Sequence, residues 1–243
     1  MTDHGRAGER RNAVPGSLST VWTLAGITLR RLGRGKALWV ALLFAALPVA
    51  YAVLVRSGQR HFHESAKDLF TVSTLLLAIV PAMFVSASIG EEIEERTSTY
   101  LWSRPIARWA VLVGKLCALT PLVIALIVGG WYVGLETEHA QAPLAATGLA
   151  LAAGCIAASL VAAGIATIVP KHGMTLTIGY MLVDLFIGAM PFSLRELSIL
   201  HQTGALAGID GDPSSIQSAL IAMGIVSGIW GAVAFLRIRR LET

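Results

Sequence analysis

The sequence predicts an all-α, polytopic membrane protein with six transmembrane helices. Of its 243 residues, 55% are apolar and only 14% are charged, whereas about a quarter of the residues in a soluble domain are charged. The charged residues are also segregated, which leaves long windows that are apolar throughout. Continuous rather than alternating apolar windows favour helices over a barrel, because each helix satisfies its own backbone hydrogen bonds in lipid.

Two segments precede the first apolar window. Residues 1–16 are polar and end in Pro15-Gly16, which predicts a flexible cytoplasmic arm. In residues 17–36 apolar side chains recur at helical spacing after Ser17, and basic residues follow them. This pattern predicts an amphipathic helix in the membrane interface, which serves either as an anchor or as a docking surface for a cytoplasmic partner.

Residues 37–243 contain six apolar windows. The first has nineteen residues without Asp, Glu, Lys or Arg, and at about 1.5 Å per residue it extends about 28 Å, close to the thickness of the hydrocarbon core. The expected spans are residues 37–55, 69–90, 110–135, 144–170, 174–194 and 214–236.

The basic residues predict the orientation of these spans. If loops alternate between the two sides, fifteen of the 19 Lys and Arg residues fall on the side of both termini. The four on the other side are Arg56, Arg60, Lys67 and Arg195. The positive-inside rule therefore places both termini in the cytoplasm. The expected location is a bacterial-type plasma membrane. Anionic headgroups attract basic residues at this boundary, so the net charge of +4 requires no nucleic-acid partner.

Small residues recur every four positions in three of the spans, and such stripes allow helices to approach closely in lipid. Span four carries the longest stripe, which predicts that it lies in the interior or at a subunit interface. Its residues are Ala150, Gly154, Ala158, Ala162 and Ala166. Shorter motifs are Gly130-x-x-x-Gly134 in span three, and Gly224-x-x-x-Gly228 and Ser227-x-x-x-Gly231 in span six.

Asp184 is the only acidic residue deep within an expected span. Burying it there costs on the order of 3 kcal/mol, so it requires a partner or a proton. One interpretation is a satisfied interhelical hydrogen bond. The other is a place on the translocation path, or in a hinge with Thr175, Thr177 or Tyr180.

The remaining candidates for chemistry are weak. His61 and His63 form an isolated His-x-His pair in the first external loop, where solvated histidines are expected instead of a metal site. Cys117 and Cys155 both fall in spans and are interpreted as packing residues. No catalytic, cofactor or metal site is predicted on the chain.

The segment between spans two and three, residues 91–115, is the most specific in the sequence. It opens with Glu91, Glu92, Glu94 and Glu95 on the side where positive charge is expected, which favours a protein partner. Ser103-Arg104-Pro105 then predicts an N-cap and the first turn of a new helix. The basic residues of the segment either bind headgroups or pair with the glutamates; they are Arg104, Arg108 and Lys115.

This pattern resembles the type-2 membrane-subunit family of ABC transporter permeases. The shared features are an acidic run, a threonine, an apolar stretch, Arg-Pro, a second arginine and a Gly-Lys pair that enters span three. They correspond here to Glu92, Glu94, Thr97, Tyr100, Leu101, Arg104, Pro105, Arg108, Gly114 and Lys115. Arg96 departs from the pattern, because many members have glycine before the threonine.

The resemblance implies a cytoplasmic coupling helix between spans two and three that binds a groove of an ABC ATPase. The implied coupling residues are Glu92, Glu94, Thr97, Arg104, Pro105 and Arg108. A phosphate-binding Gly-x-x-x-x-Gly-Lys-Ser/Thr motif is absent from the sequence, so ATP is expected on a separate ATPase chain. The resemblance also implies pairing with a second copy or a paralogue of the permease.

Other functions compete with an exporting permease. A secondary transporter or channel subunit would usually show several intramembrane ionisable groups or an internal repeat. A membrane-embedded enzyme would need catalytic groups that converge at one depth. A non-transporting assembly subunit is the third alternative, which only the resemblance disfavours. The transported substrate cannot be predicted from uniformly apolar spans, and export follows from the family analogy alone.

Overall fold

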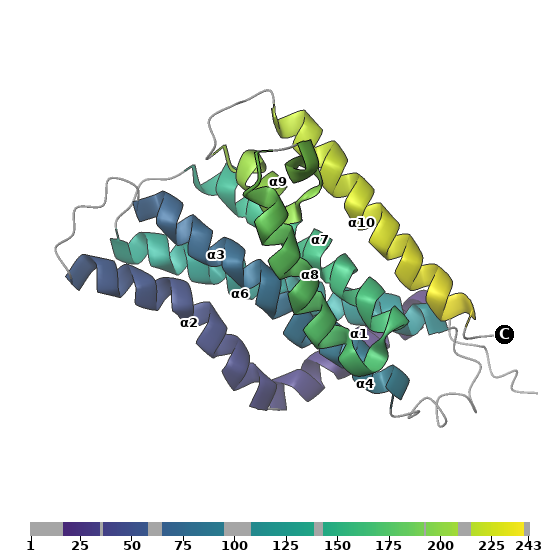
Figure 1. Cartoon of the computed structure of the whole chain (residues 1–243). Coiled ribbons are helices and arrows are strands. Elements are labelled where there is room, and N and C mark those ends of the chain that lie inside the picture. Colours follow the sequence, from purple (N-terminus) through teal and green to yellow (C-terminus); the bar gives the residue numbers. More distant parts are fainter. Residues whose placement is uncertain are drawn as a thin grey trace, which may run out of the picture.

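The structure is a computed structural model that describes residues 17–34, 36–57, 65–94, 108–138, 143–191, 193–208 and 215–240. Within these ranges all regular structure is helical and no strand is present (Figure 1). The long helices are α1 (Ser17–Arg34), α2 (Lys36–Ser57), α3 (Ser65–Pro81), α6 (Arg108–Glu138), α7 (Leu144–Ile168), α8 (Gly173–Gly188) and α10 (Ser215–Arg240). The short elements are η1 (Ala82–Ser86), α4 (Ala87–Glu94), η2 (Pro170–His172), η3 (Ser193–Leu197) and α9 (Ile199–Leu206).

Five stretches of helix in the described ranges are long and apolar enough to cross a membrane. They are Trp39–Ser57, Ala66–Glu94, Trp109–Thr137, Leu144–Ile168 and Ile216–Arg240. The second combines α3, η1 and α4 into one continuous helix. It contains a π-helical turn, in which the amide of Ala87 donates to the carbonyl of Ala82, five residues earlier.

Helix α8 covers most of the remaining expected window but has only 16 residues, or about 24 Å of helix. The chain then turns back through η3 into α9, which packs against α7, α8 and α10. Ile199, Leu200 and Thr203 of α9 are buried. The chain that follows this window therefore forms a short helix inserted among the long ones.

Helix α7 forms the centre of the bundle. It packs against α10, α6, α8, α9 and α3, and its predicted small-residue stripe is buried, as expected for an interior helix. An added methyl group at Gly154 would lie 2.7 Å from Thr203 Oγ1 of α9, and one at Gly164 would lie 2.5 Å from the Trp230 ring of α10. Small residues therefore set the spacing between α7 and its neighbours.

Of the other small-residue motifs, the one in α6 lies in the interior and the Gly224-x-x-x-Gly228 motif of α10 lies at the surface. Gly130 of α6 abuts the backbone of Ala45 in α2, and Gly134 abuts Leu69 of α3. In contrast, Gly224 and Gly228 of α10 have no atom within 4 Å of an added methyl group. The Gly224-x-x-x-Gly228 motif therefore makes no close helix contact within the described part of the chain.

The two ends of the bundle differ (Figure 1). Helices α1 and α4, the α7–α8 connection and the last turn of α10 gather at one end, which we call the α4 end. Helix α9 and the beginning of α10 lie at the opposite end, the α9 end. At the α9 end the guanidinium of Arg56 donates to the carbonyl of Thr137 at 3.3 Å, which joins α2 to α6.

Candidate functional site at the α4 end

The acidic run begins inside a helix. Helix α4 continues span two past η1 and ends at Glu94, so that Glu91, Glu92 and Glu94 occupy its last turn. At about 100° per residue, Glu91 and Glu94 lie about 60° apart on one face, while Glu92 lies about 160° from Glu94. Glu91 and Glu94 are exposed and Glu92 is partly buried. The acidic cluster is therefore divided between two faces.

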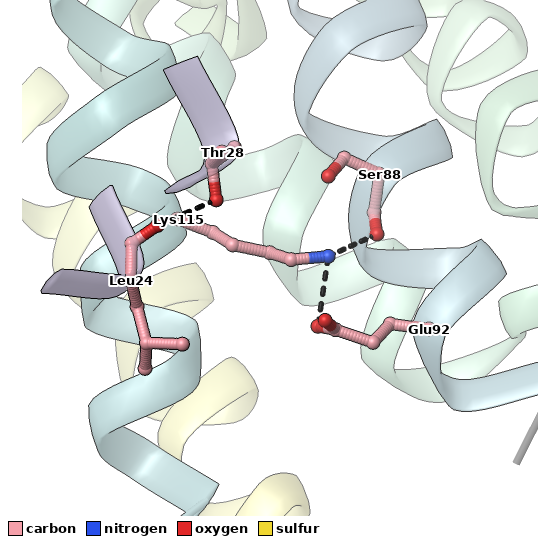
Figure 2. Close-up of polar contacts among 5 residues, drawn as sticks. All are labelled: Leu24, Thr28, Ser88, Glu92 and Lys115. Atoms are coloured by element: carbon pink, nitrogen blue, oxygen red, sulfur yellow. Dashed lines mark hydrogen bonds and ion pairs between the residues drawn. The ribbon is translucent and has the colours of Figure 1, made fainter. Parts of the chain in front are cut away.

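Glu92 faces α6 and pairs with Lys115. The Lys115 ammonium lies 2.8 Å from Glu92 Oε2, and it also donates a hydrogen bond to the backbone carbonyl of Ser88, one turn earlier in α4 (Figure 2). Of the two roles predicted for Lys115, pairing with a glutamate is the one that the structure shows. The pair is less accessible than an ordinary surface pair, because only 10% of the Lys115 side chain and 32% of the Glu92 side chain are exposed.

The backbone of α4 also packs against the connection between α7 and α8. An added methyl group at Gly90 would lie 2.6 Å from the carbonyl oxygen of Pro170 in η2. One at Gly173, the first residue of α8, would lie 2.8 Å from Ser86 Oγ of η1. Contacts this close require glycine at both positions. The end of span two therefore packs tightly against the connection between α7 and α8.

Helix α1 approaches α6 beside the same site. Val21 and Ala25 are buried, and an added methyl group at Gly114 of α6 would lie 3.1 Å from the Val21 carbonyl oxygen. Trp22, on the same predicted apolar face, is 72% exposed. Protein therefore covers only part of the apolar face that was expected to enter the membrane.

Only some of the predicted coupling residues lie in the part of the chain that the structure describes. Glu92 and Glu94 belong to α4, and Arg108 is the first residue of α6, without a described side chain. Thr97, Arg104 and Pro105 lie outside the described residues, as do His61 and His63. Within the ranges described, no three or more His, Cys, Asp or Glu side chains form a group that could hold a metal ion.

Asp184 has hydrogen-bond partners that the sequence did not indicate. Its carboxylate accepts from Ser198 Oγ at 3.0 Å, from the amide of Ile199 at 3.1 Å and from the amide of Leu200 at 3.0 Å. Amides at a helix N-terminus favour a negative charge, so Asp184 anchors the first turn of α9. Thr177, one of its expected hinge partners, donates instead to the carbonyl of Gly173.

The sequence contained one signal for this arrangement. Ser198 is a favoured N-cap type, and its hydroxyl accepts from the amide of His201 as α9 begins. Nothing in the sequence pairs that helix with a carboxylate fourteen residues earlier. Only the tertiary fold brings the two together.

The long apolar helices, packed through buried small residues, define a multi-pass α-helical membrane protein. The chain belongs to the ABC-2 family of transporter proteins: the family described as ABC-2 family transporter protein matches residues 29–192, about two thirds of its length. It is thus a permease subunit of an ABC transporter, a class that works with an ABC ATPase subunit. Comparison with curated proteins gives no match.

Proposed function

We propose that the chain is the membrane-spanning subunit of an ATP-driven exporter, and that its α4 end docks a separate ABC ATPase. The observation that supports this most directly is the exposed pair Glu91 and Glu94 at the tip of span two. Membrane topology alone favours positive charge at such a boundary. An exposed acidic face there is better explained by a basic or hydrogen-bonding surface on a protein partner.

The proposed docking face divides the coupling residues into two groups. Glu94 faces outward and would contact the ATPase, together with Thr97, Arg104 and Pro105, which lie between α4 and α6, and Arg108 at the start of α6. Glu92 faces α6 and would act within the permease, because its carboxylate is already paired with the Lys115 ammonium. This division changes the role that the resemblance implied for Glu92.

The charges of the described helices support a cytoplasmic α4 end. Among the Lys and Arg residues whose side chains the structure describes, seven belong to elements at this end: Arg30, Arg31, Lys115, Lys171, Arg237, Arg239 and Arg240. Three lie at the opposite end: Arg56, Lys67 and Arg195. By the positive-inside rule both termini face the cytoplasm, and the membrane is a bacterial-type plasma membrane.

We count six spans in this arrangement. Helix α8 is too short to cross a hydrocarbon core of about 30 Å alone, but η3 and the buried helix α9 fill the rest of that depth at the α9 end. The chain then returns through α10. An even number of spans agrees with termini on one side, and α1 lies in the cytoplasmic interface, where exposed Trp22 and Arg30 are typical residues.

The complete transporter requires further chains. ATP would bind the ATPase partner, so the permease contributes no catalytic residue to hydrolysis. A second permease, either a copy or a paralogue, would complete the translocation path. The exposed apolar side chains of α2, α8 and α10 provide surface for lipid and for that second permease; they include Leu43, Leu54, Val183, Phe186, Leu220 and Ile221.

Affinity purification of the tagged chain from its native host tests this function. We expect a stoichiometric partner that carries a Gly-x-x-x-x-Gly-Lys-Ser/Thr motif and hydrolyses ATP. Reversing the charge of both Glu91→Lys and Glu94→Lys should reduce the bound ATPase at least tenfold. The matched control is Glu136→Lys, an exposed glutamate of α6 at the α9 end, which should leave the ATPase bound.

Two results would contradict different parts of the proposal. A wild-type chain that binds no ATPase would refute the assignment to an ATP-driven transporter and favour a secondary transporter or an assembly subunit. An ATPase that stays bound to the double variant would refute docking on α4. Export predicts that cells lacking the chain accumulate the substrate inside, whereas loss of an importer would deplete it.

A further inference from the structure

Lys115 is a buried cation at the point where three helices meet. It lies on α6, and only 8% of the residue is exposed. Its ammonium bonds α4 twice, through the carboxylate of Glu92 and the carbonyl of Ser88 (Figure 2). Both partners lie on one turn of α4, so a single side chain fixes the distance and the rotation of that turn relative to α6.

Burial makes this contact costly to lose. Partly buried charges are screened less than surface charges, and removing one partner leaves the other without compensation. The neighbouring positions of α4 are apolar, because Ile89 is buried and Ile93 packs against the core. A Glu92 carboxylate without Lys115 would therefore turn toward water and carry α4 with it.

The residue before Lys115 holds the third helix. Gly114 lies against α1, with 3.2 Å between an added methyl group and Leu24 Cβ. Figure 2 also shows Leu24 and Thr28 of α1, where the Thr28 hydroxyl donates to the Leu24 carbonyl at 2.9 Å. Two consecutive residues of α6 thus hold α1 by backbone contact and α4 by a charge. A side chain at Gly114 would push α1 away by a few tenths of an ångström, and the contact with α4 requires a cation at position 115.

We propose that Lys115 is a positioning residue that fastens α4 to α6, so that a displacement of the acidic face moves spans two and three as one body. Helix α1 follows through its contact with Gly114. The source of the displacement, an ATPase on Glu91 and Glu94, rests on the proposed function. The fastening itself does not, because it is a property of the isolated chain.

Hydrogen exchange in the purified permease tests the fastening. In a Lys115→Met variant, which keeps the length of the side chain without its charge, we expect the amides of α4 to exchange at least tenfold faster. Lys115→Arg should restore most of the protection. Lys171→Met is the matched control, since Lys171 is exposed at the same end of the bundle. Equal protection of α4 in the wild type and Lys115→Met would overturn the proposal.

ATP turnover in the complete transporter tests the consequence. Lys115→Met should retain the ATPase in wild-type stoichiometry, while turnover per bound ATPase, measured relative to the free ATPase, loses most of its dependence on the permease. A purely structural role would instead reduce the yield of folded complex and leave the turnover of each remaining complex unchanged. If ATP turnover with Lys115→Met depends on the permease as strongly as in the wild type, the proposal that Lys115 transmits the displacement is overturned.

The two experiments separate this proposal from the proposed function. If the wild-type chain binds no ATPase, the proposed function fails, and hydrogen exchange still decides whether Lys115 fastens α4. If the ATPase binds but α4 is equally protected in both proteins, docking survives and the role of Lys115 is refuted.

Discussion

The carboxylate of Asp184 in α8 accepts a 3.0 Å hydrogen bond from the hydroxyl of Ser198, the residue that precedes α9. Together with the amides of Ile199 and Leu200, this bond joins the apolar helix α8 to the short helix α9 at the α9 end. Asp184 is therefore a structural anchor in this conformation, and its removal should affect stability before it affects any path through the protein.

Asp184→Leu leaves three buried donors without their acceptor. We expect a loss of at least about 3 kcal/mol in the free energy of unfolding, because each of the three buried unsatisfied donors costs about 1–3 kcal/mol. Asp184→Asn should cost less, since its amide oxygen still accepts and no charge is buried. Thermal unfolding in detergent measures both. An Asp184→Leu protein with wild-type stability but no transport would instead support a place on the translocation path.

Neighbouring glycines of α6 provide a matched test of the α2–α6 contact. A methyl group at Gly130 would lie 2.6 Å from the Ala45 carbonyl oxygen, whereas one at Gly129 meets nothing within 4 Å. Gly130→Ala should destabilise the protein by about 1–3 kcal/mol, because the backbone of α2 must shift. Gly129→Ala should be neutral or stabilising by up to about 1 kcal/mol, owing to its better helix propensity. Equal melting temperatures for the two variants would show that α2 does not pack as described.

The α7–α10 contact allows a second comparison of two glycines. A methyl group at Gly164 would lie 2.5 Å from the Trp230 ring and 3.1 Å from the Trp230 carbonyl oxygen. At Gly231 the nearest atom is Leu160 Cδ2, at an ordinary 3.6 Å. We therefore expect Gly164→Ala to lower the melting temperature and Gly231→Ala to leave it nearly unchanged. The reverse order would contradict the packing of Trp230 on Gly164.

The reactivity of the two cysteines tests whether α7 lies at the centre of the bundle. Cys155 of α7 is fully buried, while Cys117 of α6 is exposed. A small maleimide that partitions into detergent micelles should modify Cys117 on the outer surface of α6 and reach Cys155 only after denaturation. Mass spectrometry of the resulting peptides measures the two rates. Comparable labelling of both residues in the folded protein would place α7 at the surface.

The sequence predicted the helices well because lipid imposes a simple rule. Any apolar window of sufficient length must become a helix that satisfies its own backbone, so composition and spacing were enough for the five long stretches. The small-residue stripe of α7, which was predicted to lie in the interior or at a subunit interface, is buried within the chain. Gly224 and Gly228 show the limit of that argument, since an identical spacing lies open on the surface of α10.

Contacts between distant segments could not be predicted to the same degree. The sequence offered several cations for the glutamates, and only the fold selects Lys115 for Glu92. Spacing alone also did not reveal that the acidic run divides between two faces, because this depends on where α6 lies. Helix α9 and its bond to Asp184 depend similarly on the chain turning back after α8.

The π-helical turn at Ala82–Ser86 determines which glutamate meets Lys115. Such a turn contains one residue more than an α-helical turn. It therefore absorbs one extra residue between α3 and α4, and the side chains of α4 point as they would in a regular helix that is one residue shorter. If the turn tightened to an α-helix with no residue removed, α4 would rotate by about 100°, and Glu91 would replace Glu92 beside Lys115. Removing Met83 should have no such effect, because a regular helix would then hold Glu92 where it is. Because Glu91 and Glu92 are adjacent, one of them lies beside Lys115 whether or not span two contains the π-helical turn.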